Sequence, residues 1–151
     1  MVKVLIVYHS QGGNTEAAAK AVEKGAGQVE GVQVTIKDGL KATIDDLLDC
    51  DALAIGTPDY FSYMAGGLKD FFDRTFYPTQ GKVTNKPYFT FITHGGGGKA
   101  IESVEKIAAA FKFKKVEEPI LVEGRPDQKA EARLIEAGRK LATVALKKCW
   151  Y

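Results

Sequence analysis

The segment that most constrains the fold is the N-terminal run of residues 2–26. Residues 2–7, Val-Lys-Val-Leu-Ile-Val, form a short β-branched apolar run that Tyr8 closes, which is typical of a buried strand. Residues 9–15 are all small or polar, and the alanine-rich stretch that follows has the composition of a helix. A strand, a tight polar loop and a helix in this order predict the first unit of a parallel α/β sheet.

The loop of residues 9–15 is suited to binding an anion. Gly12 and Gly13 allow a sharp turn in which backbone N–H groups converge, and Ser10, Asn14 and Thr15 add neutral polar groups. The helix behind the loop directs its positive end towards it, so a phosphate is the favoured ligand. The alternative is a strand–helix junction whose capping residue serves the structure alone. The spacing matches neither the Walker A motif nor Gly-x-Gly-x-x-Gly.

Length and charge limit the possible classes of protein. The chain has 151 residues, enough for one domain with a real core, and we expect a single domain over residues 1–151. The formal net charge of +2 does not favour nucleic-acid binding. No apolar run approaches the ~20 residues of a membrane span, and no signal peptide is evident. We therefore expect a cytoplasmic protein without membrane insertion.

The two cysteines, Cys50 and Cys149, are expected to be free thiols. They are far apart in the sequence and form no Cys-x-x-Cys motif, so the sequence predicts neither a zinc site nor an iron–sulfur cluster.

Strand patterns and helix patterns alternate along the chain. Strands are expected at residues 2–8, 32–37, 52–56, 87–93 and 120–122. Helices are expected at about residues 14–26, 66–76, 99–113 and 128–147, with a short helical turn at 45–48. This alternation predicts a doubly wound α/β fold with a five-stranded parallel sheet and helices on both faces. The loops 9–15, 57–65 and 94–98 all follow strands, so we expect them to meet at the carboxyl edge, where such folds bind ligands.

The second and third loops suit a flat ligand. Residues 57–65 are expected to be irregular and are rich in aromatic and other apolar side chains, which would stack on a planar ring for roughly 0.5–1.5 kcal/mol per ring pair. The alternatives are a loop folded onto itself and a subunit interface. Four glycines follow His94 and would let a ligand approach the backbone, or serve as a hinge. Together the loops predict a ligand with one phosphate and one flat heteroaromatic ring.

The three loops resemble those of the flavodoxin family, in the same order and over essentially the whole chain. Residues 10–15, Ser-Gln-Gly-Gly-Asn-Thr, are similar to the family's FMN phosphate motif Ser/Thr-x-x-Gly-Asn-Thr. Residues 56–65 and 94–96 resemble the flavin-ring loops of the branch that includes the WrbA-type NAD(P)H:quinone reductases. The resemblance implies a single flavodoxin-like domain with strand order 2-1-3-4-5 and a non-covalently bound FMN.

The resemblance also implies which residues bind FMN. The phosphate would be held by Ser10, Gln11, Gly12, Gly13, Asn14 and Thr15. The isoalloxazine ring would be flanked by Pro58, Asp59, Tyr60, Phe61, Ser62, Tyr63 and Met64 on the second loop, and by Thr93, His94, Gly95, Gly96 and Gly97 on the third. No metal is expected.

The chain departs from the family's pattern in two ways. Its isoelectric point is near 8.4, whereas electron carriers of the family are usually strongly acidic. Ser62 stands where related loops often have glycine. The resemblance implies that a peptide flip in this loop stabilises the one-electron reduced flavin, and a serine raises the cost of that flip because positive φ carries a Cβ penalty. We therefore expect a bias towards two-electron reduction.

Several functions are compatible with this resemblance. The favoured one is that of a flavoprotein that transfers electrons to or from a redox partner protein. An alternative is an NAD(P)H-dependent FMN oxidoreductase that uses nicotinamide and quinone molecules, with His94 as the catalytic group that donates a hydrogen bond or proton at the ring edge. The third is a non-redox module that binds a regulatory ligand. A homodimer is also open, because related reductases form dimers and tetramers.

Overall fold

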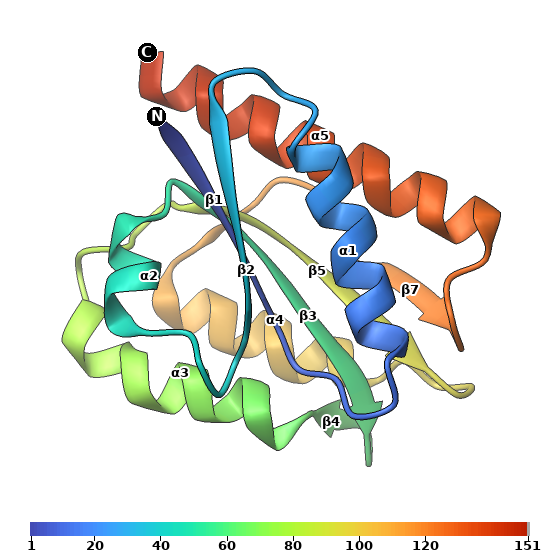
Figure 1. Ribbon diagram of the computed structural model, residues 1–151. Helices are drawn as coiled ribbons and strands as arrows, with labels where there is room; N and C mark the ends of the chain where they lie inside the picture. Colours follow the sequence, from blue (N-terminus) through green and yellow to red (C-terminus); the bar gives the residue numbers. More distant parts are fainter. Residues whose placement is uncertain (151) are drawn as a thin grey trace.

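The computed structural model describes residues 1–150, with side chains described up to residue 148, so the prediction for the Cys149 thiol lies outside the described part. A twisted sheet lies between two layers of helices (Figure 1). The strands are β1 (Val2–Tyr8), β2 (Val32–Asp38), β3 (Ala52–Tyr60), β4 (Tyr63–Met64), β5 (Pro87–His94), β6 (Lys114–Lys115) and β7 (Ile120–Glu123). The helices are α1 (Asn14–Ala26), α2 (Ile44–Asp49), α3 (Gly66–Thr79), α4 (Ala100–Phe111) and α5 (Gln128–Trp150).

The expected topology is confirmed. The five principal strands lie in the order β2-β1-β3-β5-β7 and all pair in parallel, which is the order 2-1-3-4-5 of the predicted strands. Two strands of two residues each were not expected. β4 pairs antiparallel with β3, and β6 pairs with the start of β5, whereas β7 pairs with its end. The last strand of the sheet is therefore divided into two short pieces.

The core lies in two apolar layers, one on each face of the sheet. Alternate residues of β1 point to opposite faces: Val4 and Ile6 pack in the cluster below α1 and α5, and Leu5 and Val7 in the cluster that includes side chains of α2, α3 and α4. Figure 1 shows α1 and α5 side by side on one face and the other three helices opposite. No helix among the described residues is long and apolar enough to cross a membrane.

Two glycines bring α1 and α5 into close contact. A Cβ atom at Gly25 would overlap the carbonyl of Ile135, and one at Gly138 would overlap the carbonyl of Val22. Backbone therefore packs on backbone where these helices cross. Because the N-terminus of α1 follows the first loop, this contact fixes the direction in which that loop faces.

Helices α2 and α3 are longer than the sequence predicted, and α4 is slightly shorter. A capping box between Thr43 and Asp46 starts α2 at Ile44. α3 continues past the expected end to Thr79. Pro78 lies in its last turn, so the proline disturbs the helical hydrogen bonds only at the end of the helix. α4 ends at Phe111 because Lys112 takes a left-handed conformation with φ of 64°.

Candidate functional site

The three loops meet at one cleft, as expected. A cleft of about 290 Å³ opens at the carboxyl edge of the sheet, and all three loops line it. The lining residues are Ser10, Gln11, Gly12, Asn14, Thr15, Pro58, Asp59, Tyr60, Thr93, His94, Gly95 and Gly124. The register brings the loops together, since Pro58 pairs with Thr93 and the N–H of His9 donates to the carbonyl of Gly56.

The first loop presents unpaired backbone donors at the start of α1. Gly13 takes a left-handed conformation with φ of 97°, and its N–H donates to Ser10 Oγ at 3.1 Å. No side chain within residues 1–148 caps α1. The first N–H groups of a helix have no intrahelical partner, and the helix dipole adds partial positive charge there. The geometry therefore suits an anion held by neutral groups.

A buried hydroxyl pair connects the first and third loops. Thr15 Oγ1 and Thr93 Oγ1 lie 2.7 Å apart, and both residues are almost fully buried. Thr15 lies in the first turn of α1 and Thr93 is near the end of β5, so this hydrogen bond holds the first loop against the centre of the sheet.

The second loop differs from the irregular segment that the sequence predicted. Here β3 continues through Tyr60 and turns back into β4 as a two-residue hairpin, with Tyr60 paired to Tyr63. Beyond Gly56, β3 has β5 as its parallel neighbour but no longer β1, so the missing N–H of Pro58 is tolerated there. The expectation of an irregular segment over residues 57–65 was therefore wrong for residues 57–60 and 63–64, which lie in β3 and β4.

The hairpin turn places two non-glycine residues at positive φ. Phe61 has φ of 58° and Ser62 has φ of 62°, the combination that a type I′ turn requires. Each left-handed residue costs about 1–2 kcal/mol in backbone strain. The Phe61 side chain is fully exposed at 102%, whereas Met64 is buried in the core at 3%. Neither of these two predicted ring-binding residues lines the cleft, and the same holds for Ser62 and Tyr63.

The third loop is arranged around His94. The N–H of Gly96 donates to His94 Nδ1 at 3.0 Å, so the neutral imidazole carries its proton on Nε2. The Gly124 N–H donates to the His94 carbonyl at 2.8 Å, which places the loop after β7 in the same cleft. Gly96 and Gly97 do not line the cleft.

Gly124 was missed by sequence reasoning. It follows the last strand and has φ of 69°, so the glycine directly after residues 120–123 was the available signal for a fourth loop at this edge. Ser103 was also missed: its buried hydroxyl accepts the N–H of Met64 at 3.0 Å, and no sequence pattern distinguishes it from other polar residues of α4.

His9 supports the cleft from outside. Its Nδ1 lies 3.1 Å from Asp38 Oδ2, and its ring packs so closely on Gly67 that a Cβ there would overlap it. Nearby, burial and, to a lesser extent, the carboxylate of Glu16 raise the pKa of Tyr8, whose hydroxyl donates to Glu16. The phenol therefore stays protonated at neutral pH beside the first loop.

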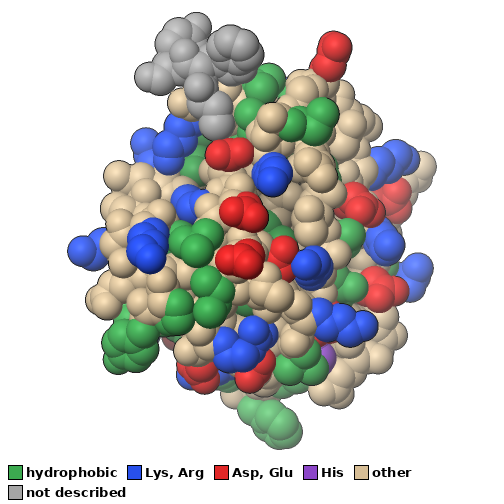
Figure 2. All heavy atoms as spheres, turned by 60° about the vertical axis from the view of Figure 1, so that its left-hand side comes forward, with side chains coloured by type: hydrophobic (Ala, Val, Ile, Leu, Met, Phe, Trp, Pro, Cys, Tyr) green, Lys and Arg blue, Asp and Glu red, His purple; other side chains and the backbone are tan. Residues whose placement is uncertain are grey.

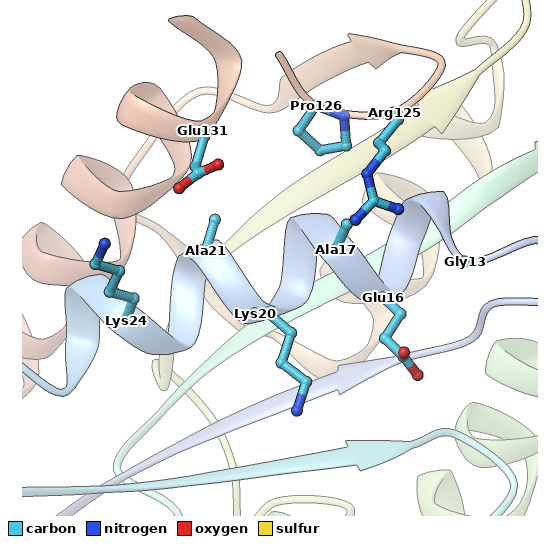
Figure 3. A pocket seen from close by; sticks show the side chains of 9 residues that line it. All are labelled: Gly13, Glu16, Ala17, Lys20, Ala21, Lys24, Arg125, Pro126 and Glu131. Carbon is cyan, nitrogen blue, oxygen red and sulfur yellow. The ribbon is translucent and has the colours of Figure 1, made fainter. Parts of the chain in front are cut away.

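A second hollow lies on the other side of α1 and differs in chemistry. It has a volume of about 410 Å³, and Gly13 lines it rather than the cleft. Figure 3 shows Arg125 and Glu131 reaching towards α1 from the chain around the start of α5, while Lys20 and Glu16 point away from α5. Its wall mixes charges of both signs and has no aromatic side chain, so it offers no surface for a flat ring. Among the described residues, no three His, Cys, Asp or Glu side chains gather as metal ligands would.

Comparison with known proteins agrees with this fold. The family model described as Flavodoxin matches residues 6–138. A flavodoxin of Aquifex aeolicus (strain VF5) is 36% identical over 98 residues, which are 65% of this chain. That match spans about half of the relative's length, 53%.

Solved structures share the fold at lower identity. A flavodoxin from the domain Archaea superposes with a TM-score of 0.84 at 23% identity, covering 95% of this chain and 99% of that one. A flavodoxin, WrbA-like protein from Agrobacterium tumefaciens gives a TM-score of 0.82 at 21% identity, covering 97% and 99%.

Proposed function

Because the chain belongs to the flavodoxin family, we propose that it transfers electrons through a non-covalently bound FMN. The observation that carries this proposal is the cleft that combines an uncapped, cation-free phosphate loop with flat side chains. FMN, when bound, supplies the redox chemistry, and the protein binds and orients it.

The first loop would hold the phosphate. Residues 10–15 supply backbone N–H groups at the start of α1, together with the side chains of Ser10, Asn14 and Thr15. Hydrogen bonds to a charged phosphate are stronger than those between neutral groups, so a loop without lysine or arginine is sufficient.

The second and third loops would hold the ring. Pro58 and Tyr60 offer flat surfaces in the cleft, and Gly95 lets the ring approach the backbone. Phe61 and Tyr63 have exposed side chains on the same hairpin and would add cover over the ring. Gly96, Gly97, Ser62 and Met64 do not line the cleft, so their predicted part in ring binding is not included in this arrangement.

Two measurements test the cofactor. The purified protein should be yellow, with flavin absorption bands, and mass spectrometry of the released cofactor should give FMN. The single phosphate loop is the reason to expect FMN rather than FAD. Finding FAD, or a colourless protein that does not bind added FMN, would contradict the proposal.

An NAD(P)H-dependent quinone reductase is the second candidate, and His94 is the observation that favours it. The bond from Gly96 to Nδ1 leaves the Nε2–H free to donate towards the cleft, as a group acting at the ring edge would need. In an assay with NADH or NADPH and a quinone, this function requires steady oxidation of the nicotinamide. His94→Gln should slow that oxidation when the rate is expressed per bound FMN.

Membership of the family does not decide which partners the protein has or where in the cell it lies. The favoured function requires a redox partner protein. Whether the protein forms a homodimer can be measured by sedimentation. The bias towards two-electron reduction and the cytoplasmic location stay predictions from the sequence. A non-redox module that binds a regulatory ligand would give a purified protein without the yellow colour of a flavin.

A further inference from the structure

Asp59 accepts hydrogen bonds from two different segments of the cleft. It lies at the end of β3, half-buried, and its carboxylate is part of the cleft wall. Oδ1 accepts the N–H of Ser62 at 2.9 Å, at the tip of the hairpin. Oδ2 accepts the N–H of Ala100 at 3.3 Å, where α4 begins. One side chain therefore connects the second loop to the helix that follows the third loop.

The hairpin tip has little else to hold it. Phe61 is fully exposed and Ser62 is exposed as well, so neither packs on the core. Both residues have left-handed backbone conformations that non-glycine residues avoid unless their surroundings impose them. Besides the strand pairing of Tyr60 with Tyr63, the hydrogen bond from Ser62 to Asp59 holds this turn.

The base of the hairpin has a separate attachment to the same helix. The buried hydroxyl of Ser103 accepts the N–H of Met64 at 3.0 Å and donates to the Ala100 carbonyl at 2.7 Å. The hairpin is thus fastened to the first turn of α4 at two points. Ser103 holds the base, and Asp59 holds the tip.

We propose that Asp59 is a positioning residue that fastens the hairpin tip to the N-terminus of α4 and so fixes the spacing between the second and third loops. A carboxylate suits this position because it accepts the N–H of Ala100, the first residue of α4, whereas the N–H groups of Ile101 and Glu102 donate to backbone carbonyls, and because the helix dipole attracts negative charge. Charge-assisted bonds of this kind are stronger than neutral ones. The effect of this clamp on bound FMN rests on the function proposed above.

The charge of Asp59 has a second consequence at the cleft. A negative charge near a flavin opposes the gain of further electrons, because like charges repel more strongly in a partly buried site than in water. Replacing Asp59 by a neutral residue should therefore shift the midpoint potential of the bound cofactor to a more positive value. A residue that only maintained the fold would not move the potential in this direction.

The clamp can be tested on the cofactor-free protein by amide hydrogen exchange followed by NMR. We compare the wild type with Asp59→Ala and Asp59→Asn. Asp51→Asn is the matched control, because Asp51 also accepts a backbone N–H, from Lys3 at 2.8 Å, but lies before the opposite end of β3. In Asp59→Ala, protection of the Ser62 and Ala100 amides should fall together by about 10-fold or more. Unchanged protection of both amides in the folded variant would overturn the proposal.

The asparagine variant keeps the test available if the alanine variant does not fold. The new amide side chain retains one acceptor oxygen, so Asp59→Asn should lose protection at one of the two backbone amides and keep it at the other. The control should keep protection at both. Loss at Ser62 and Ala100 in Asp51→Asn as well would mean that any change on β3 loosens the hairpin, which also overturns the proposal.

The holoprotein gives the second readout. Asp59→Asn should raise the midpoint potential of bound FMN and weaken FMN binding by about 10-fold, the equivalent of one hydrogen bond. Asp51→Asn should do neither. Equal potentials in all three proteins would refute the electrostatic effect. Because amide exchange needs no cofactor, a failure of the clamp and a failure of FMN binding are distinguishable.

Discussion

At the scale of single residues, Asn14 and Thr15 separate phosphate binding from ring binding. The double variant Asn14→Ala/Thr15→Ala should weaken FMN more than riboflavin, because only FMN has the phosphate that we propose the first loop binds. Each lost charge-assisted hydrogen bond costs on the order of 1.5–3 kcal/mol.

Titrations of the cofactor-free protein with both ligands measure this difference. Riboflavin is the internal control, since losing the Thr15–Thr93 hydrogen bond affects both ligands through the shared scaffold. Equal losses for FMN and riboflavin would show that the first loop does not hold the phosphate.

Cys50 predicts how stability changes in alkali. Burial is the main cause that raises the pKa of its thiol to about 11 in the folded protein, above the ordinary value of 9.0. Between these two values the unfolded chain loses the thiol proton first, so the free energy of unfolding falls as pH rises through this window. The contribution is on the order of 2–3 kcal/mol.

Urea unfolding of wild type and Cys50→Ala measures the Cys50 contribution, because other titrating groups cancel in the difference. The stability advantage of the wild type should shrink between pH 9 and pH 11 and stay constant from pH 6 to pH 8. A constant difference over the whole range would contradict the burial of this thiol.

At the scale of secondary-structure elements, the crossing of α1 and α5 depends on two glycines, Gly25 and Gly138, which have no side chain. Gly138→Ala should destabilise the protein by about 1–3 kcal/mol, because the new Cβ overlaps the Val22 carbonyl and the helices must separate. Gly66→Ala is the matched control: it also changes a helical glycine, but no atom lies within 4 Å of the new Cβ.

Denaturant midpoints of both variants test this packing. The control should be neutral or slightly stabilising, because alanine has the higher helix propensity. A Gly138→Ala protein as stable as Gly66→Ala would mean that α5 can move away from α1 without loss of packing.

The elements also show which features the sequence could predict. Apolar runs bounded by turn residues located four of the five principal strands, because burial on both faces of a parallel sheet favours continuous apolar residues. The fifth, β2, lies at the edge of the sheet and was located by its alternation of apolar and polar residues. The β3–β4 hairpin escaped prediction because its turn lacks glycine, asparagine and aspartate at the two positions that need positive φ. Asp59 and Thr57 also hold the hairpin, by accepting the N–H groups of Ser62 and Ala65 within the same segment, and the pattern of apolar residues does not encode such side-chain bonds.

At the scale of the whole molecule, the charge distribution predicts weak electrostatic steering. The formal net charge is +2, and Figure 2 shows basic and acidic side chains interspersed over the face that it presents. Reoxidation of the reduced protein by anionic ferricyanide and by cationic hexaammineruthenium should each change by less than about threefold between low and high salt.

Stopped-flow kinetics over a range of ionic strengths measure the steering. The two oxidants should respond in opposite directions if a local patch near the cleft dominates, and a tenfold or larger response would reveal such a patch. That result would contradict the weak steering expected from the net charge.

The cleft itself was predictable only in part. Glycines and polar residues after successive strands indicated three loops at one edge, because parallel strands share their carboxyl ends. The sequence did not reveal which members of each loop line the cleft. Gly13 lines the second hollow and the Met64 side chain enters the core, since the turn conformations decide which way each residue of a loop faces.

The crossing of α1 and α5 has a consequence for the order in which the protein becomes functional during synthesis. The first loop and α1 leave the ribosome early, but α1 ends at Ala26 whereas the helix that packs on it begins only at Gln128. Thr93 and Gly124, which complete the cleft, are also made late. A nascent chain therefore carries its first loop before α5 is there to support it, and the cleft is complete for a cofactor only after α5 has been made.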